Sequence, residues 1–211
     1  MIEILFEDAD ILVCIKPAGY LSEESDSGER SLPRLIANER GLSEIFTVHR
    51  LDREVSGVMV YAKNRSAAAS LSAQVADRSF EKEYLAVLEG VPEADEATLT
   101  DLLFKDSRRN KSFVVDRKRA GVKEASLSYK TLDKRGTRSL VRIKLHTGRT
   151  HQIRVQFASR KMPVMGDGKY GSSVRSSEIA LASCYISFKH PRSAERVSFS
   201  YSPIGEMWEL G

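Results

Sequence analysis

The stretch VHRLDREVSGVMVYAKN, residues 48–64, joins a charged segment to an apolar one. Residues 58–61, Val-Met-Val-Tyr, are bounded by a glycine and by a Lys-Asn pair, which is typical of a buried strand. In the charged segment, Asp52 stands in a predicted turn between Arg50 and Arg53. Neighbouring cations favour the ionised form of a carboxylate and lower its pKa, so the sequence predicts that Asp52 acts as an anion, as a nucleophile does. The structural alternative is a salt-bridged loop that caps the strand.

The composition is that of a globular chain with a mild basic bias. Of its 211 residues 41% are hydrophobic, enough to bury a core as one large domain or as two fused halves. The formal net charge of +4 fits an anionic partner. Cys14 and Cys184 lie far apart in apolar stretches, so we expect two core thiols, not a metal site or a disulfide. Neither a membrane span nor a signal peptide is visible, which predicts a cytoplasmic protein without membrane contact.

The rest of the chain predicts many short strands and few helices. One helix is predicted to begin at the cap Ser31 and to end at Gly41, and a second begins at Asn64 or Ser66. Apolar runs and alternating patterns predict strands at residues 2–6, 11–15, 58–61, 84–88, 140–145 and 179–188, with further strands between 99 and 133.

A third helix is predicted after the strand that ends near residue 145. Thr150 is expected to cap it, Ile153 and Phe157 to face the core, and His151 and Arg154 to share another face, since they stand three residues apart. This helix therefore carries both core and candidate functional residues.

Two other stretches contain candidate functional residues. Tyr84 belongs to the apolar run 84–88, where a strand tyrosine is by default a core aromatic. Basic residues concentrate farther along, in a segment that is either a solvated hairpin or an arm that grips phosphate. They are Lys105, Arg108, Arg109, Lys111, Arg117, Lys118, Arg119 and Lys123.

These stretches together resemble the RluA-type family of RNA pseudouridine synthases. Residues 49–57 resemble its H-R-L-D-x-x-T-S-G signature, and residues 82–86, Lys-Glu-Tyr-Leu-Ala, resemble K-x-Y-L-A. Residues 147–154 match T-G-R-T-H-Q-I-R at every position, and residues 166–171 resemble the G-D-x-x-Y-G loop. The chain departs from the family pattern at three positions, which are Val55, Gln156 and Ala182.

The resemblance implies an α+β fold, the pseudouridine synthase fold. We expect a long, mixed and mostly antiparallel sheet in two halves around a central cleft, with flanking helices and loops. Residues 1–211 are expected to form a single catalytic domain, without the small RNA-binding S4 domain that many relatives carry before it.

The activity implied by the resemblance is isomerisation of uridine to pseudouridine in structured RNA, ribosomal or transfer. The base must be flipped out of its stack, and Arg50 is placed to fill the gap. By resemblance, Asp52 acts as nucleophile or as base at the sugar, Tyr84 packs against the base and Arg154 pairs with Asp52. No metal, redox cofactor or protein partner is expected, and the chain should be a monomer. The expected RNA contacts are His49, Arg50, Arg108, Arg109, Lys111, Arg149, His151 and Lys169.

Two alternatives come from other functional classes. A catalytically silent RNA-binding paralogue would keep a basic surface but has no need of Asp52, Tyr84 and Arg154 together. A metal-dependent nuclease needs clustered carboxylates, whereas the acids near the signatures are few and flanked by arginines.

Overall fold

The computed structural model describes residues 2–25 and 30–210, which fall into two compact units. Unit 1 comprises the chain up to residue 82 together with residues 182–203, and unit 2 comprises residues 83–181 and the chain from residue 204 on. Two of the three boundaries fall within strands, and the third follows the last strand.

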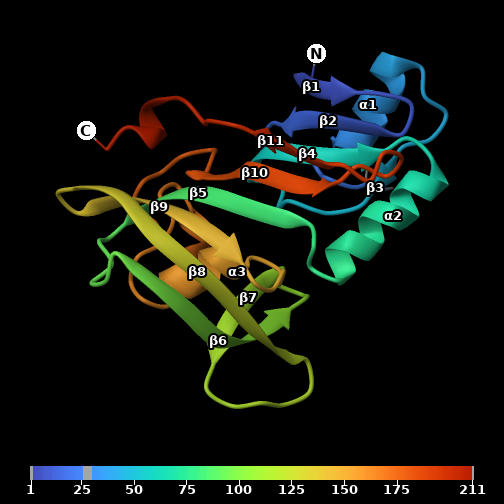
Figure 1. The fold of residues 1–211 in the computed structure, drawn as a ribbon. Helices are drawn as coiled ribbons and strands as arrows, with labels where there is room; N and C mark the ends of the chain where they lie inside the picture. The colour runs from blue at the N-terminus through green and yellow to red at the C-terminus, as the bar shows by residue number, and fades with distance from the viewer. Residues whose placement is uncertain (1, 26–29, 211) are drawn as a thin grey trace. The chain divides into compact units, whose positions relative to one another are not determined.

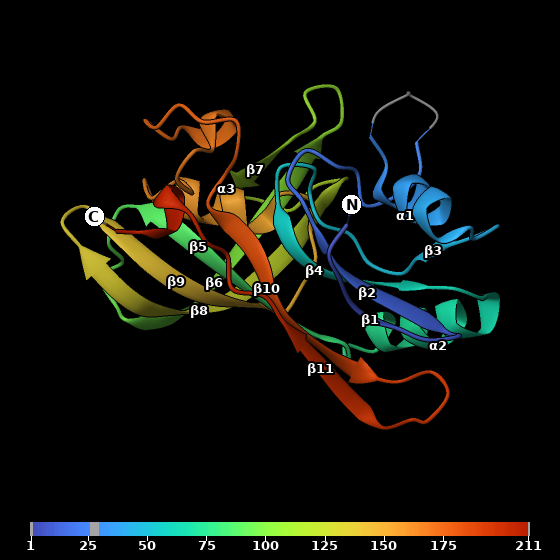
Figure 2. The same cartoon turned by 90° about the horizontal axis from the view of Figure 1, so that it is seen from above.

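Unit 1 is a mixed sheet in which β1 pairs with β2, β2 and β3 pair with β4, and β10 pairs with both β4 and β11 (Figure 1). Only the pairing of β4 with β10 is parallel among the pairs of this unit in the described residues. Figure 2 shows β10 and β11 as an antiparallel pair. The strands are β1 (Ile4–Glu7), β2 (Ile11–Lys16), β3 (Phe46–Thr47), β4 (Ser56–Ala62), β10 (Leu181–Lys189) and β11 (Arg196–Ser200).

Two helices accompany this sheet, α1 (Leu32–Arg40) and α2 (Arg65–Ala76). The predicted caps are confirmed: Ser31 accepts a hydrogen bond from the first turn of α1, and Asn64 does the same for α2. Apolar side chains of α2 pack against alternate residues of β2 and β4 to form the core of the unit. β1 and β2, at two of the predicted strands, pair as an antiparallel hairpin.

Unit 2 is an antiparallel sheet in the order β5, β9, β8, β6, β7 (Figure 1). Along β9 the burial alternates as predicted: Val141 and Ile143 are buried, whereas Arg142 and Lys144 are exposed on the open face. The strands are β5 (Glu81–Glu89), β6 (Glu96–Asp106), β7 (Lys111–Val115), β8 (Val122–Arg135) and β9 (Arg138–Leu145).

The helix α3 (Gln152–Ala158) contacts β6, β7 and the short 3₁₀ helix η1 (Gly168–Tyr170), and a second 3₁₀ helix, η2 (Glu206–Trp208), lies near the C-terminus. The predicted cap of α3 was wrong. The helix begins after His151, whose φ of 52° is left-handed, and Thr150 lies one residue before it. The reason is that all seven residues of α3 are buried or nearly so, and packing sets its start more strongly than capping.

The α+β class and the mixed, mostly antiparallel strand pairing are confirmed. Cys14 and Cys184 are buried thiols, as predicted, and burial raises the pKa of Cys14 to about 12. None of the helices in residues 2–25 and 30–210 has the length and hydropathy needed to cross a membrane.

Candidate active site residues

Asp52 lies in a tight turn of unit 1 between β3 and β4. Its carbonyl oxygen accepts a hydrogen bond from the backbone N–H of Val55 at 3.0 Å. Leu51 and Val55 on either side are buried, whereas Asp52 is only partly buried. Ser22 fixes the approach to the turn, because its hydroxyl donates to the carbonyl of Leu51 at 2.8 Å and accepts from the N–H of Leu51 at 3.0 Å. The turn is therefore anchored on both sides of a carboxylate that solvent can reach.

Lys16, at the end of β2, is a second anchor of this turn that sequence reasoning missed. It is fully buried, and its Nζ donates to the carbonyls of Pro17, Tyr20 and Arg53 at 3.1, 2.8 and 3.1 Å. Burial lowers the pKa of Lys16 to about 8, although the charges of Asp52 and Glu54 act in the opposite direction. Three acceptors match the three N–H groups of an ammonium, so Lys16 is protonated at neutral pH.

His49 was predicted to contact RNA, but the structure places it in the core of unit 1. Its Nε2 accepts a hydrogen bond from the N–H of Val60 at 3.1 Å, and its ring lies 5.1 Å from that of Phe80. Burial holds the pKa of His49 well below its usual range, with the charge of Lys82 acting in the same direction. A neutral, buried imidazole that accepts from β4 has a structural role, and direct contact with RNA is not supported.

Arg50, by contrast, is exposed as a residue that inserts into RNA must be. Its guanidinium pairs with Glu23 at 3.0 Å, and its side chain is 67% exposed. The turn therefore points alternate side chains inward and outward: His49 and Leu51 are buried, and Arg50 reaches solvent.

Arg154, in unit 2, is buried on α3 with 2% of its surface exposed. Its guanidinium forms a bidentate ion pair with the carboxylate of Asp167: Nε of Arg154 lies 2.6 Å from Oδ2, and Nη2 lies 2.9 Å from Oδ1. A buried guanidinium is tolerated only with such a partner, since an uncompensated charge in the interior is costly. Sequence reasoning missed Asp167 as a partner of Arg154. The available signal was the G-D-x-x-Y-G loop at residues 166–171, in which only Lys169 was given a role.

His151 was also predicted to contact RNA and is instead buried, with 6% of its surface exposed. Its Nδ1 lies 2.9 Å from the hydroxyl of Tyr170, which also accepts from the N–H of Ser112 at 2.8 Å. Ser112 in turn donates its hydroxyl to the carbonyl of Thr150 at 2.7 Å. These bonds join β7 to the start of α3, so the geometry supports a structural role for His151.

Tyr84 lies on β5 opposite Ile143 of β9 and is 5% exposed. The strand is as predicted, and the ring belongs to the buried face of the sheet. Burial fits the core alternative as well as a ring that packs against a base, so the catalytic role of Tyr84 stays a prediction.

The remaining candidate RNA contacts lie around the turn between β6 and β7. Arg108 and Arg109 are exposed, and their backbone N–H groups bond to the carboxylate of Asp106 at 3.0 and 3.1 Å. Lys111 donates to the carbonyl of Lys169 at 2.5 Å, while Lys169 donates to the carbonyl of Asn110 at 3.3 Å. The structure therefore brings Lys169 to the turn of this hairpin.

Arg149 is partly buried beside the same sheet of unit 2, where its Nε donates to the carbonyl of Glu124 at 2.9 Å. This bond uses the guanidinium's Nε and leaves the terminal nitrogens as the groups that an RNA phosphate would meet.

The three departures from the family pattern are all buried. Val55 and Ala182 are apolar and pack in unit 1. Gln156, in unit 2, donates its Nε2 to the carboxylate of Asp101 at 2.7 Å and to the carbonyl of Leu99 at 3.3 Å. These side chains act in packing, with Gln156 attaching α3 to β6.

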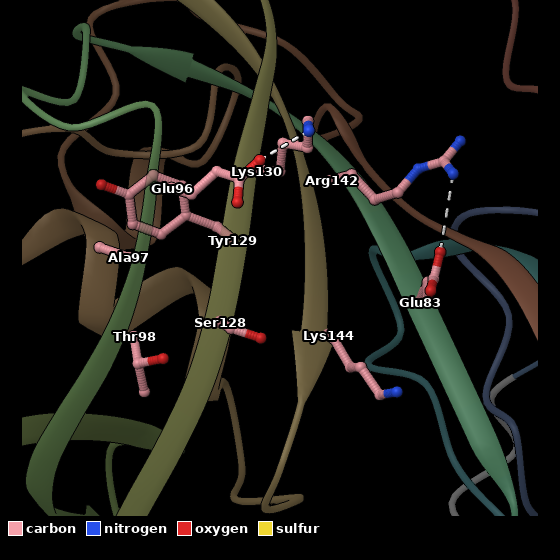
Figure 3. Close-up of a pocket in the computed structure, with 9 residues that line it drawn as sticks. All are labelled: Glu83, Glu96, Ala97, Thr98, Ser128, Tyr129, Lys130, Arg142 and Lys144. Atoms are coloured by element: carbon pink, nitrogen blue, oxygen red, sulfur yellow. Dashed lines mark ion pairs between the residues drawn. The ribbon is translucent and has the colours of Figure 1, made fainter.

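A hollow of about 380 Å³ lies on the open face of the unit 2 sheet (Figure 3). Its acids are paired, Glu96 with Lys130 at 2.6 Å and Glu83 with Arg142 at 3.8 Å. It contains none of the predicted catalytic or RNA-binding residues. The residues that line it are Glu83, Glu96, Ala97, Thr98, Ser128, Tyr129, Lys130, Arg142 and Lys144.

Metal ligation was not expected, and the described part of the chain has no group of three His, Cys, Asp or Glu side chains arranged to bind a metal ion. That the reaction needs no cofactor stays a prediction.

Comparisons with known proteins agree on one family. A family model described as RNA pseudouridylate synthase matches residues 10–159. An uncharacterized RNA pseudouridine synthase of Aquifex aeolicus is 36% identical, with 94% of this chain and 68% of the relative covered. The ribosomal large subunit pseudouridine synthase D of Zymomonas mobilis is 31% identical over 94% of this chain and 68% of its own length.

Solved structures show the same fold. Human RNA pseudouridylate synthase domain containing 1 matches with a TM-score of 0.80 at 24% identity, covering 96% of this chain and 84% of that protein. At this identity the likeness concerns the fold alone.

Proposed function

Because the chain belongs to the RNA pseudouridylate synthase family and is thus an RNA-modifying isomerase, we propose that it converts specific uridines of ribosomal RNA to pseudouridine. The observation that supports this activity is the match of the family model over residues 10–159. Ribosomal RNA is favoured as the substrate because relatives named ribosomal large subunit pseudouridine synthase D align with nearly the whole chain. Transfer RNA is the competing substrate.

In the proposed mechanism Asp52 acts on the sugar of a flipped uridine, as nucleophile or as base. The bond between N1 and the sugar breaks, the uracil turns, and carbon 5 is joined to the sugar, so the base loses its C5 proton and gains one at N1. The partly buried position of Asp52 in an anchored turn supports this role. Arg154 is proposed as the cationic partner of Asp52 and Tyr84 as the residue that packs against the base, both by resemblance to the family signatures.

We further propose that the hairpin of β6 and β7 grips the RNA backbone. Arg108 and Arg109 are exposed at its turn, and Lys111 and Lys169 lie beside the same turn. Each phosphate that a cation neutralises releases counterions, which makes the affinity depend on salt.

Release of tritium from RNA that contains 5-tritiated uridine tests the activity directly, since carbon 5 must lose its proton. Asp52→Asn should fold and bind RNA but retain less than about 1% of the wild-type rate, because a carboxamide fits the space and cannot ionise. Asp77→Asn, an exposed carboxylate of the same unit, is the matched control and should react like wild type. Mapping pseudouridines in the host's ribosomal and transfer RNA with and without the gene then decides the substrate.

The RNA-binding hairpin is tested separately by the Arg108, Arg109 and Lys111 triple alanine variant. It should weaken RNA binding and flatten the slope of log affinity against log salt by about two to three units, with the single-turnover rate at saturating RNA nearly intact. The control removes three cations from the hollow of Figure 3 in the same unit, by alanine substitution of Lys130, Arg142 and Lys144. An equal flattening in both variants would mean that the hairpin has no special role.

A further inference from the structure

The buried pair of Arg154 and Asp167 is more specific than charge neutralisation requires. Asp167 is 1% exposed and Arg154 2%, and the two hydrogen bonds use Nε and Nη2 of the guanidinium. Because the guanidinium is planar, a bidentate carboxylate fixes the plane and the direction of the whole group. The opposite edge of the guanidinium, which carries the N–H groups of Nη1 and the second N–H of Nη2, therefore faces away from Asp167 in a fixed direction.

A second contact restricts the same group. The guanidinium carbon of Arg154 lies 5.3 Å from the centre of the Tyr170 ring. That ring is held at its hydroxyl by Ser112 and His151, so it does not turn freely. Arg154 therefore has a carboxylate on one edge and a fixed aromatic ring beside it.

The loop that delivers Asp167 is itself constrained. Gly166, just before it, has a φ of 83°, and a Cβ at this position would overlap the carbonyl oxygen of Glu178. The N–H of Asp167 donates to the carbonyl of Val164 at 3.0 Å. The backbone conformation of this loop therefore fixes the position of Asp167.

We propose that Asp167 is a positioning residue, which holds Arg154 in the one orientation that serves the isomerisation. The inference rests on the proposed function, because it assigns to Arg154 a role in that reaction. Asp167 acts only through Arg154 and contacts neither the base nor the sugar. A displaced guanidinium should slow the chemical step and leave RNA binding unchanged, since geometry at the reacting groups affects the rate more than the affinity.

The test compares single-turnover tritium release with RNA affinity in Asp167→Asn. This variant keeps one acceptor for Arg154 and loses the second charged oxygen, and its rate should fall about tenfold or more while its Kd for RNA stays within about twofold. Asp101→Asn is the matched control. Asp101 forms a similar bidentate pair with Arg160 in the same unit, at 2.9 and 3.1 Å, and also accepts a hydrogen bond from Gln156 of α3 at 2.7 Å. The variant therefore weakens the attachment of the helix that carries Arg154 but leaves the ion pair of Arg154 with Asp167 in place. Its rate should stay within about twofold of wild type.

Two further variants separate positioning from folding. Asp167→Glu keeps the charge in the interior but moves the carboxylate by one methylene, so it should fold and still lose rate. In an Arg154→Lys background, where no bidentate pair can form, Asp167→Asn should cost less than it costs in wild type. The proposal is overturned if Asp167→Asn and Asp167→Glu react like wild type, or if the loss is as large in the Arg154→Lys background.

Asp52→Asn is assayed in parallel, so that the two hypotheses fail differently. An inactive wild-type protein contradicts the proposed function. An active wild type, with Asp52→Asn inactive and both Asp167 variants unimpaired, contradicts the positioning role alone.

Discussion

The turn that carries Asp52 and the helix that carries Arg154 are both anchored, but by different kinds of bond. In unit 1, buried polar side chains bond to the main chain: Lys16 to the carbonyl of Arg53, and Ser22 to both groups of Leu51. In unit 2, side chain bonds to side chain, as between Arg154 and Asp167. The turn of unit 1 should therefore be sensitive to its backbone geometry, whereas the site of unit 2 should be sensitive to the identity of individual partners.

The largest effect is expected from crowding the backbone of unit 1 at Gly57. Its φ is 124°, and a Cβ there would lie 2.5 Å from the nitrogen of Ser183 on β10 and closer still to the oxygen. Gly57→Ala should lower the free energy of unfolding by at least about 3 kcal/mol, through overlap and strain together. The measurement is urea denaturation.

The control for this change is Gly19→Ala, a glycine of the same unit with a φ of 87°, where a Cβ meets nothing within 4 Å. It should cost only the strain, about 1 kcal/mol. Equal losses at the two glycines would show that backbone conformation, and not the close approach of β4 to β10, is what matters.

Next in size is the loss of the buried ammonium that holds the Asp52 turn. Lys16→Met removes the Nζ donor from three carbonyls, of which only that of Arg53 keeps a second donor within the described part of the chain, the N–H of Gly19 at 2.8 Å. We therefore expect a loss of about 1–3 kcal/mol in stability and about a tenfold fall in single-turnover rate. Lys63→Met is the control. Lys63 bonds to Glu7 and to the carbonyl of Asp8, so the variant should lose stability but keep the rate. A slow Lys63→Met would contradict a specific role for Lys16.

The pKa of about 8 makes the same anchor sensitive to alkaline pH. Between about pH 8 and the ordinary lysine value of 10.5, the unfolded chain keeps a proton that the folded chain has lost, so this group makes the free energy of unfolding rise with pH. The neutral amine has only two N–H groups for three carbonyls, however, so the rate should fall above about pH 8. Lys16→Met should lack this part of the pH–rate profile.

Acid pH is expected to have a smaller effect, through His49. Burial lowers its pKa, so below the ordinary value of 6.5 the unfolded chain binds a proton that the folded chain does not. This group should reduce the free energy of unfolding by about 1.4 kcal/mol for each pH unit below 6.5, in the range above its folded pKa. His49→Gln, whose amide oxygen can accept from Val60, should flatten the dependence between pH 7.5 and 5.5. An unchanged slope in this variant would contradict the assignment to His49.

Local patterns predicted the elements well, because their causes are local. The caps Ser31 and Asn64, the alternation along β9 and the turn around Asp52 all depend on residues within a few positions of one another. The direction of polar side chains depends on distant chain segments and was not predicted. His49 is a polar residue next to the exposed Arg50, and yet it bonds to β4 eleven residues away.

The partner of Arg154 illustrates the same limit. Asp167 follows it by 13 residues through a loop, and the contact depends on the left-handed backbone of Gly166, which no hydrophobic period reveals. Lys16 was missed because a lysine at a strand end is ordinarily solvated, and only the folded turn shows three carbonyls converging on it. Family signatures named the catalytic candidates, but not the groups that hold them.

The smallest effect concerns Arg50, the exposed member of the Asp52 turn. Glu23 pairs with it at 3.0 Å at the surface, and such pairs contribute little to stability, so Glu23→Gln should change the free energy of unfolding by less than about 1 kcal/mol. If Arg50 enters the RNA, Glu23 competes with it, and the variant should bind RNA roughly twofold to fivefold more tightly. Glu24→Gln removes the same charge one position away, where the acid pairs with Arg34 at 3.9 Å. Both variants change the net charge equally. A gain in RNA affinity that is confined to Glu23→Gln supports a role for Arg50, whereas equal gains in the two variants would mean that only the net charge matters.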